Sequence, residues 1–214
     1  MFIQRFFESD PMPAFIQVLV VIFAVCCHEF AHAWVALKQG DSTAADAGHL
    51  TLNPLKQMGL FSLIMLAFLG LAWGAVPVNP SRMRHKYSEV LVALAGPLTN
   101  LALFVIFTIM AVINANFIKN SGFTLLFGIG AIFNIVLFIF NMLPIPSLDG
   151  WTVFRRFIQN RVNLNSEFVK GMMIFLILVL VIFSEKLFQA GTWLFLHFAG
   201  LVNTLFIMVG MVKV

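Results

Sequence analysis

Apolar residues occur in six long runs along the chain, separated by short polar segments. The runs cover residues 14–37, 58–76, 90–113, 122–143, 168–188 and 192–212. A helix needs about 20 mainly apolar residues to cross the hydrocarbon core of a bilayer, and most of these runs reach that length. The pattern therefore predicts an all-α polytopic membrane protein with about five transmembrane helices.

The run at residues 58–76 differs from the others because Gly59, Gly70 and Gly74 interrupt it. We expect it to form a re-entrant or hairpin element rather than a single crossing. Residues 49–53 alternate polar and apolar side chains, which is typical of a strand. Together with residues 76–79 they predict short β segments beside this element, near the candidate site described below.

The chain divides into three parts. Residues 1–13 mix phenylalanine with charged residues and include two prolines, which predicts an interfacial segment. Residues 14–160 form a transmembrane core that carries the candidate chemistry. Residues 161–214 form C-terminal transmembrane helices.

Composition supports the membrane assignment and excludes several classes. Hydrophobic residues make up 61% of the chain and charged residues 10%, with a mean hydropathy of +0.97. A soluble domain carries about 25% charged residues, so a water-soluble globule is excluded, and so is a nucleic-acid-binding tail. The two cysteines, Cys26 and Cys27, are adjacent and cannot form a disulfide framework.

The first apolar run contains the sequence His28-Glu29-Phe30-Ala31-His32. On a helix, residues four apart lie one turn apart on the same face, so His28 and His32 form half of a tetrahedral zinc site. Glu29 lies beside them, where a carboxylate can act as a general base. His28 is about 14 Å from the end of its run at 1.5 Å per residue. An ionisable residue at that depth costs about 2.5–3.5 kcal/mol unless it is paired or metal-bound.

A catalytic zinc ion needs a third protein ligand and one open position. The remaining candidate ligands in or near apolar runs are Glu89, Asp149, Glu185 and His197. Asp149 fits best, because Pro144 and Pro146 interrupt the backbone before it, and irregular backbone at membrane depth lines polar cavities. The alternative for Asp149 is the N-cap of a short helix that starts at Trp151.

These motifs give the chain a resemblance to the site-2 proteases, which are zinc metalloproteases of the membrane interior. The matching pieces are HEFAH at 28–32, AGPLTN at 95–100 and NMLPIPSLDG at 141–150. AGHLTLNPLK at 47–56 and VPVNP at 76–80 are similar to the small bacterial members that lack a PDZ domain. His49 stands where an arginine is common in the family, and Ser147 where a proline is common.

The resemblance implies one zinc ion per chain, with His28, His32 and Asp149 as its ligands. It implies Glu29 as the general base and Asn100 as a residue that polarises or orients the scissile carbonyl. The implied activity is hydrolysis of peptide bonds within or near transmembrane segments. The predicted substrate-binding residues are Asn141, His49, Thr51, Asn53 and Val78. No PDZ domain is visible, so we expect substrate selection to depend on prior trimming by another protease or on a membrane partner; the oligomeric state stays open.

The site also constrains topology. His28, Asn100 and Asp149 meet only if residues 38–89 cross the membrane an even number of times, which favours the re-entrant interpretation of 58–76. Ten of the thirteen basic residues then lie on the metal side. They are Lys38, Lys56, Arg82, Arg84, Lys86, Arg155, Arg156, Arg161, Lys170 and Lys213. By the positive-inside rule this side is cytoplasmic, which predicts an active site towards the cytoplasm. The resemblance implies a multi-pass protein of the bacterial cell membrane.

Two other functions use the same residues. A zinc channel or transporter could bind the ion in transit at these ligands, although transporters usually contain internal repeats, and none is visible here. An inactive family member could bind membrane segments without cleaving them. The transport alternative assigns no task to Glu29. The presence of all four residues, His28, Glu29, His32 and Asp149, counts against an inactive protein.

Overall fold

The computed structural model describes residues 10–158 and 166–212. Most of the expected interfacial segment 1–13 therefore lies outside the described residues. Long helices dominate: α1 (Met12–Lys38), α5 (Ser88–Ile113), α6 (Ser121–Asn141) and α8 (Ser166–Met208). The shorter helices are α2 (Thr43–Asp46), α3 (Pro54–Gln57), α4 (Gly59–Leu69) and α7 (Asp149–Ile158), with a 3-10 turn at Pro80–Arg82 and a π-helical turn at Asn114–Ile118.

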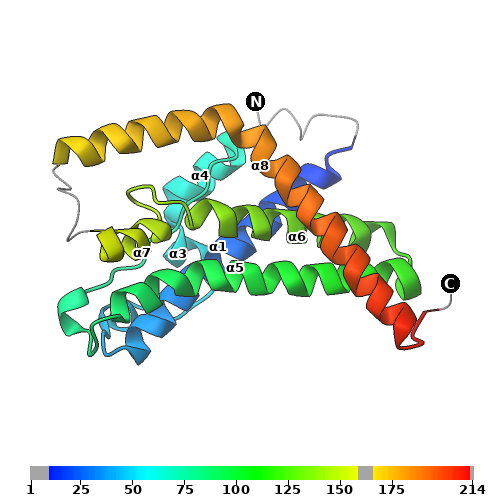
Figure 1. Cartoon of the computed structure of the whole chain (residues 1–214), viewed down its shortest axis with the longest axis horizontal. Coiled ribbons are helices and arrows are strands. Elements are labelled where there is room, and N and C mark those ends of the chain that lie inside the picture. Colours follow the sequence, from blue (N-terminus) through cyan, green and yellow to red (C-terminus); the bar gives the residue numbers. More distant parts are fainter. Residues whose placement is uncertain (1–9, 159–165, 213–214) are drawn as a thin grey trace.

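The core of the molecule is the packing of α1, α5 and α6 against one another (Figure 1). Small side chains line these contacts: Ala24, Ala33 and Ala36 on α1 and Ala131 on α6 are fully buried. Helices in a membrane associate through such small residues, because they let the backbones approach closely. The close approach places polar groups of neighbouring helices within hydrogen-bonding distance.

Helix α4 is too short to cross a membrane. Its 11 residues span roughly 16 Å, about half of a hydrocarbon core. It ends at Gly70, whose φ of 74° is accessible to glycine without strain. The chain then returns in an extended segment, residues 71–79, beside α1. Helix α4 and this segment thus form a hairpin that is too short to be a single crossing, and its re-entry into a membrane stays a prediction.

Four helices in the described residues are long and apolar enough to span a membrane. They are Met12–Lys38, Ser88–Ile118, Ser121–Asn141 and Glu185–Met208. The sequence predicted about five, because it treated residues 168–188 and 192–212 as separate helices. In the structure both runs belong to α8, a single helix that changes direction along its length (Figure 1). The last part of α8 packs on α6 and α5.

The short β segments that the sequence predicted are not formed as strands anywhere in residues 10–158 or 166–212. Residues 49–53 make a bend instead, and the side-chain amide of Gln57 donates hydrogen bonds to the carbonyls of His49 and Thr51. Asn53 caps α3 by accepting from the N–H of Leu55. Local capping therefore outweighs the alternating pattern in this segment.

Candidate metal centre

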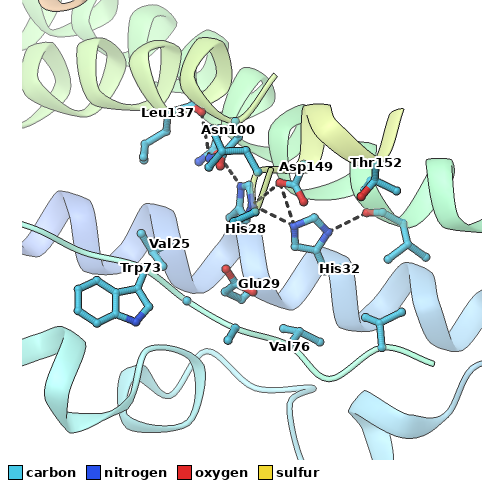
Figure 2. Close-up of a pocket in the computed structure, with 18 of the residues that line it drawn as sticks. Val25, His28, Glu29, His32, Trp73, Val76, Asn100, Leu137, Asp149 and Thr152 are labelled. Atoms are coloured by element: carbon cyan, nitrogen blue, oxygen red, sulfur yellow. Dashed lines mark hydrogen bonds and ion pairs between the residues drawn. The ribbon is translucent and has the colours of Figure 1, made fainter. Parts of the chain in front are cut away.

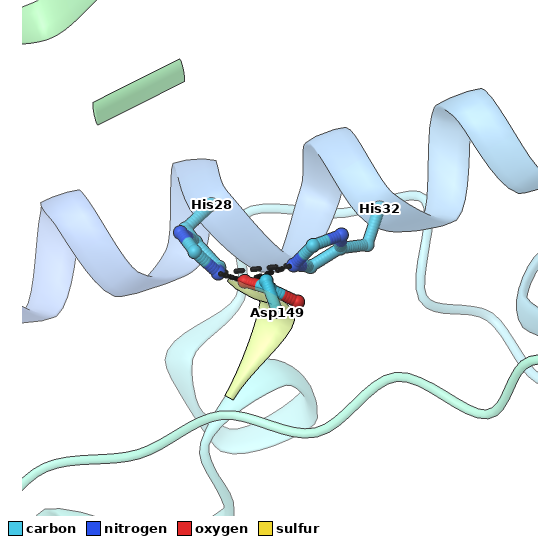
Figure 3. Close-up of side chains that lie close together, drawn as sticks. All are labelled: His28, His32 and Asp149. Atoms are coloured by element: carbon cyan, nitrogen blue, oxygen red, sulfur yellow. Dashed lines mark hydrogen bonds and ion pairs between the residues drawn. The ribbon is translucent and has the colours of Figure 1, made fainter. Parts of the chain in front are cut away.

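Two histidines of α1 and one aspartate of α7 converge in the interior (Figure 3). The Nε2 atoms of His28 and His32 lie 2.9 Å apart. One carboxylate oxygen of Asp149 lies 3.0 Å from Nε2 of His28 and 3.3 Å from Nε2 of His32. The histidines are 7% and 8% exposed and the Asp149 side chain is 20% exposed, so most of this group is shielded from solvent. Its three ligand atoms lie within 4.8 Å of one another, as the donors of a single metal ion must.

The loop between α6 and α7 delivers Asp149 to the histidines. Helix α6 ends at Asn141, and the prolines at 144 and 146 keep the following residues from continuing it. Gly150 lies so close to the Met142 carbonyl that a Cβ atom there would collide with it. Burial alone would raise the pKa of Asp149, but the rings of His28 and His32, when protonated, outweigh burial and lower the pKa to about 2. The carboxylate is therefore ionised, as a metal ligand must be.

Each histidine uses its Nδ1 atom to bind a neighbour on another helix. His32 Nδ1 lies 2.7 Å from the backbone carbonyl oxygen of Val92, and His28 Nδ1 lies 2.6 Å from Oδ1 of Asn100. A carbonyl oxygen only accepts, so Nδ1 of His32 donates and its Nε2 carries a lone pair in the neutral ring. Acceptor atoms facing a carboxylate at about 3 Å repel one another unless a cation or a proton lies between them. The donor set of two imidazoles and one carboxylate fits Zn²⁺.

Glycines hold α5 and the extended segment against this centre. A Cβ atom at Gly96 of α5 would collide with Nε2 of both His28 and His32. A Cβ atom at Gly74 of the extended segment would collide with the carboxyl group of Glu29. Figure 2 shows Glu29 pointing from α1 towards the segment that carries Trp73 and Val76, while Asp149 lies with the histidines. The absence of side chains at these two positions is therefore a condition for the geometry of the site.

The extended segment is fixed along one side. The Ser62 hydroxyl exchanges two hydrogen bonds with the backbone of Trp73, and the N–H of Ala75 donates to the carbonyl of Gln57. Further along, the N–H of Asn79 donates to the fully buried carboxylate of Asp41 at 2.6 Å. These contacts hold the segment beside Glu29.

A cavity of about 580 Å³ opens onto the metal-binding group. His28, Glu29, His32 and Asp149 all line it, so the possible metal ligands and the free carboxylate share one compartment. The other lining residues include residues 72–76 of the extended segment, the end of α6 and the start of α7. A cavity that carries polar side chains among membrane-spanning helices is what chemistry with water inside a membrane requires.

Comparison with known proteins identifies the family. The model of "Peptidase family M50" matches residues 108–184. A curated protein of Bacillus subtilis, named "Putative zinc metalloprotease YwhC", is 36% identical over 183 residues, which are 81% of this chain and 83% of the relative. The chain belongs to peptidase family M50, the site-2 proteases. It is a zinc metalloprotease by membership of that family.

Two further relatives of this site-2 protease are matched over a smaller share of their length. The protein named "Putative zinc metalloprotease Rip2" of Mycolicibacterium smegmatis is 33% identical over 153 residues, 64% of this chain and 57% of the relative. The corresponding protein of Methanocaldococcus jannaschii, named "Putative zinc metalloprotease MJ0611", is 34% identical over 151 residues and is matched over 69% of its length. No solved structure matches the chain.

The structure brings some of the predicted substrate-binding residues to the cavity of this site-2 protease and leaves others away from it. Val78 and Asn141 line the cavity. His49, Thr51 and Asn53 do not: they belong to the bend before α3, where the ring of His49 bonds the side chain of Gln57. Their polar atoms serve the local fold of the bend.

Asn100 lines the cavity, but its side chain is fully buried and bonds His28 and Asn134. Of the alternative ligands, Glu89 lines the cavity without joining the metal-binding group, and His197 bonds the carbonyl of Trp193.

Sequence reasoning missed Gly74, Gly96 and Asn134. Gly96 belongs to the AGPLTN motif, so a signal for it existed. Gly74 was visible only as a break in an apolar run, and no local pattern marks Asn134, because the roles of both residues arise from contacts between segments far apart in the chain.

Proposed function

We propose that this site-2 protease is an intramembrane endopeptidase with one Zn²⁺ ion per chain, held by His28, His32 and Asp149. The observation that carries the proposal is the buried group of two imidazoles and one carboxylate that shares a cavity with Glu29. A structural group would need no free carboxylate beside it. Zinc in this position would supply Lewis acidity towards a peptide carbonyl and towards water.

Glu29 acts as the general base. Glu29 is 8% exposed, lines the cavity and lies outside the group of possible metal ligands. It takes the proton of the attacking water and returns it to the nitrogen of the leaving amine. A base of this kind must lie within hydrogen-bonding reach of both atoms, which the shared cavity supports.

The substrate binds as an extended chain along residues 74–78. Trp73 and Ala75 use backbone groups to bond Ser62 and Gln57 on the side away from the cavity. Backbone groups of an extended chain alternate in direction, so those of Gly74 and Val76 point to the opposite side. An unwound substrate segment would satisfy its own peptide groups by pairing with this edge. The second edge expected from the sequence, residues 49–53, has no support because that segment is a bend.

Asn100 has a smaller role in substrate binding than the sequence suggested. Its Oδ1 atom accepts from His28, and one Nδ2 hydrogen goes to Asn134 at 3.0 Å. One N–H hydrogen is left for the scissile carbonyl, and it becomes available only when the cavity widens around this fully buried side chain. We assign Asn100 first to holding His28 and second to orienting the carbonyl. Asn141 and Val78 contact the substrate from the cavity wall.

We propose transmembrane-segment proteins of the bacterial cell membrane as substrates, with the site facing the cytoplasmic side. Basic residues gather where α1 ends and α5 begins: the N–H of Arg84 bonds the carbonyl of Gln39, and Lys86 and Arg156 both lie against the ring of Tyr87. This clustering supports the orientation through the positive-inside rule. Substrates are then selected through prior trimming by another protease or through a membrane partner.

The test is cleavage of a single-span model substrate by the purified protein in detergent, with bound zinc quantified. Wild type and Glu29→Gln should each hold one zinc ion, and only wild type should cleave. Zinc in both with cleavage in neither would favour a transport or binding protein instead. A folded wild type without zinc would overturn the metal centre.

A further inference from the structure

A chain of buried hydrogen bonds connects His28 to the backbone of α6. His28 Nδ1 lies 2.6 Å from Oδ1 of Asn100, and Nδ2 of Asn100 lies 3.0 Å from Oδ1 of Asn134. Nδ2 of Asn134 lies 2.8 Å from the carbonyl oxygen of Gly130. Both asparagine side chains are 0% exposed. These hydrogen bonds therefore connect α1 through α5 to α6, and the two asparagines in them have no contact with solvent.

The carbonyl of Gly130 determines which atom donates and which accepts in each of these hydrogen bonds. A carbonyl oxygen only accepts, so the atom of Asn134 that faces it must be the amide nitrogen. The oxygen of Asn134 then faces Asn100, which must present its own amide nitrogen there. The oxygen of Asn100 is left facing His28, so Nδ1 of His28 must carry the hydrogen.

This arrangement determines which ring nitrogen of His28 carries the lone pair. A neutral imidazole with hydrogen on Nδ1 has its lone pair on Nε2, the atom that lies 3.0 Å from Asp149. His32 reaches the same state more directly, because its Nδ1 bonds the carbonyl of Val92. The tautomer of each imidazole is thus set by a backbone carbonyl. His32 bonds its carbonyl directly, and His28 is connected to its carbonyl through the side-chain amides of Asn100 and Asn134.

An amide side chain can exchange its oxygen and nitrogen by a half-turn with almost no change in shape. If Asn100 turned, its N–H would face Nδ1 of His28 and its oxygen would face the oxygen of Asn134. The repulsion between those oxygens prevents the turn. Without Asn134, Asn100 can donate to His28 and favour the tautomer with hydrogen on Nε2, which has no lone pair for a metal there.

We propose that Asn134 is a positioning residue for the metal centre: through Asn100 it holds His28 in the tautomer whose Nε2 lone pair faces Asp149. This rests on the proposed function, because it treats Nε2 of His28 as a zinc ligand. The tautomer of His28 exists in the metal-free protein, so it can be measured independently of zinc binding.

The experiment compares the full-length wild type with Asn134→Leu, which removes the acceptor, and Asn134→Asp, which keeps an oxygen facing Asn100. Thr108→Val is the matched control, since it removes a fully buried hydroxyl of α5 that bonds only the Phe104 carbonyl. Zinc affinity is measured by competition with a chelator. The tautomer of His28 is read from imidazole ¹⁵N shifts of the metal-free protein with neutral rings, assigned with His28→Ala.

We expect the wild type and Thr108→Val to carry hydrogen on Nδ1 of His28 and to bind zinc equally. Asn134→Leu should bind zinc about 10–100-fold more weakly, the usual cost of losing an outer-shell partner of a metal ligand. Its ¹⁵N shifts should move towards the other tautomer, and Asn134→Asp should lie closer to wild type. A folded Asn134→Leu with the affinity and tautomer of wild type would overturn the proposal.

Two further results are decisive if Asn134→Leu does not fold or the protein lacks zinc. Wild type with hydrogen on Nε2 of His28 overturns the proposal without any variant. Wild type that binds no zinc overturns the proposed function alone, while the ¹⁵N shifts of wild type and Asn134→Leu still decide whether Asn134 sets the tautomer.

Discussion

Replacing Gly96 by alanine places a methyl group between α5 and the two imidazoles of the metal centre. The new Cβ atom would collide with Nε2 of both His28 and His32. Carbon atoms in ordinary contact lie about 3.5–4.0 Å apart, so the rings or the helix must retreat by roughly 1 Å. Metal–ligand distances vary by only about 0.2 Å. We therefore expect Gly96→Ala to weaken zinc binding by 100-fold or more.

The same substitution also tests packing. Inserting a methyl group into a filled interior costs about 1–3 kcal/mol. Gly128→Ala is the matched control, because a Cβ atom at Gly128 of α6 meets nothing within 4 Å. That control should keep its zinc and be unchanged or slightly stabilised, since alanine favours helix by up to about 1 kcal/mol over glycine.

The assay measures zinc per chain after competition with a chelator, alongside thermal unfolding in detergent. A folded Gly96→Ala protein that binds zinc within about threefold of wild type would refute the argument that α5 holds the imidazoles at contact distance. Loss of zinc from Gly128→Ala as well would show that any added methyl group in these helices disturbs the site.

Three further predictions follow from individual contacts. Gly74→Ala should abolish cleavage while zinc is retained, because the new Cβ atom collides with Glu29 and not with a ligand; equal loss of zinc would contradict this. Asp41→Asn should lower stability by about 1–3 kcal/mol at neutral pH. Burial would raise the pKa of Asp41, but hydrogen bonds from Thr43 and Asn79 hold it below the ordinary 3.8, so the stabilisation is lost as the pH falls through that lower pKa. The gap in melting temperature between wild type and Asp41→Asn should therefore shrink below about pH 4, and a constant gap would argue against it. Chelation should lower the melting temperature of wild type but leave Asp149→Asn nearly unchanged, as scanning calorimetry can measure.

The centre of the site could be predicted because it depends on local rules. Helical spacing brings His28 and His32 to one face, and the two prolines before Asp149 mark the break that delivers it. Both features survive in any packing of the helices. The membrane class was equally accessible, since it rests on the length of the apolar runs.

The missed features depend on contacts between distant parts of the chain. Gly74 and Gly96 are needed only because other elements approach them, and Asn134 acquires its role through Asn100 and the carbonyl of Gly130. Residues 49–53 alternate as a strand would, yet Gln57 binds their carbonyls and turns them into a bend. Neither apolar run near the C-terminus shows by itself that both continue into one helix, α8.

The central claim is that Glu29 and the metal centre cut a peptide bond inside the membrane, and mapping the cut tests it most directly. Wild type and Glu29→Gln would be reconstituted in liposomes with a single-span substrate, and the products identified by mass spectrometry. The account predicts a break within or immediately beside the apolar segment with wild type and none with Glu29→Gln. A break confined to the soluble part of the substrate, or the same products from Glu29→Gln, would contradict it.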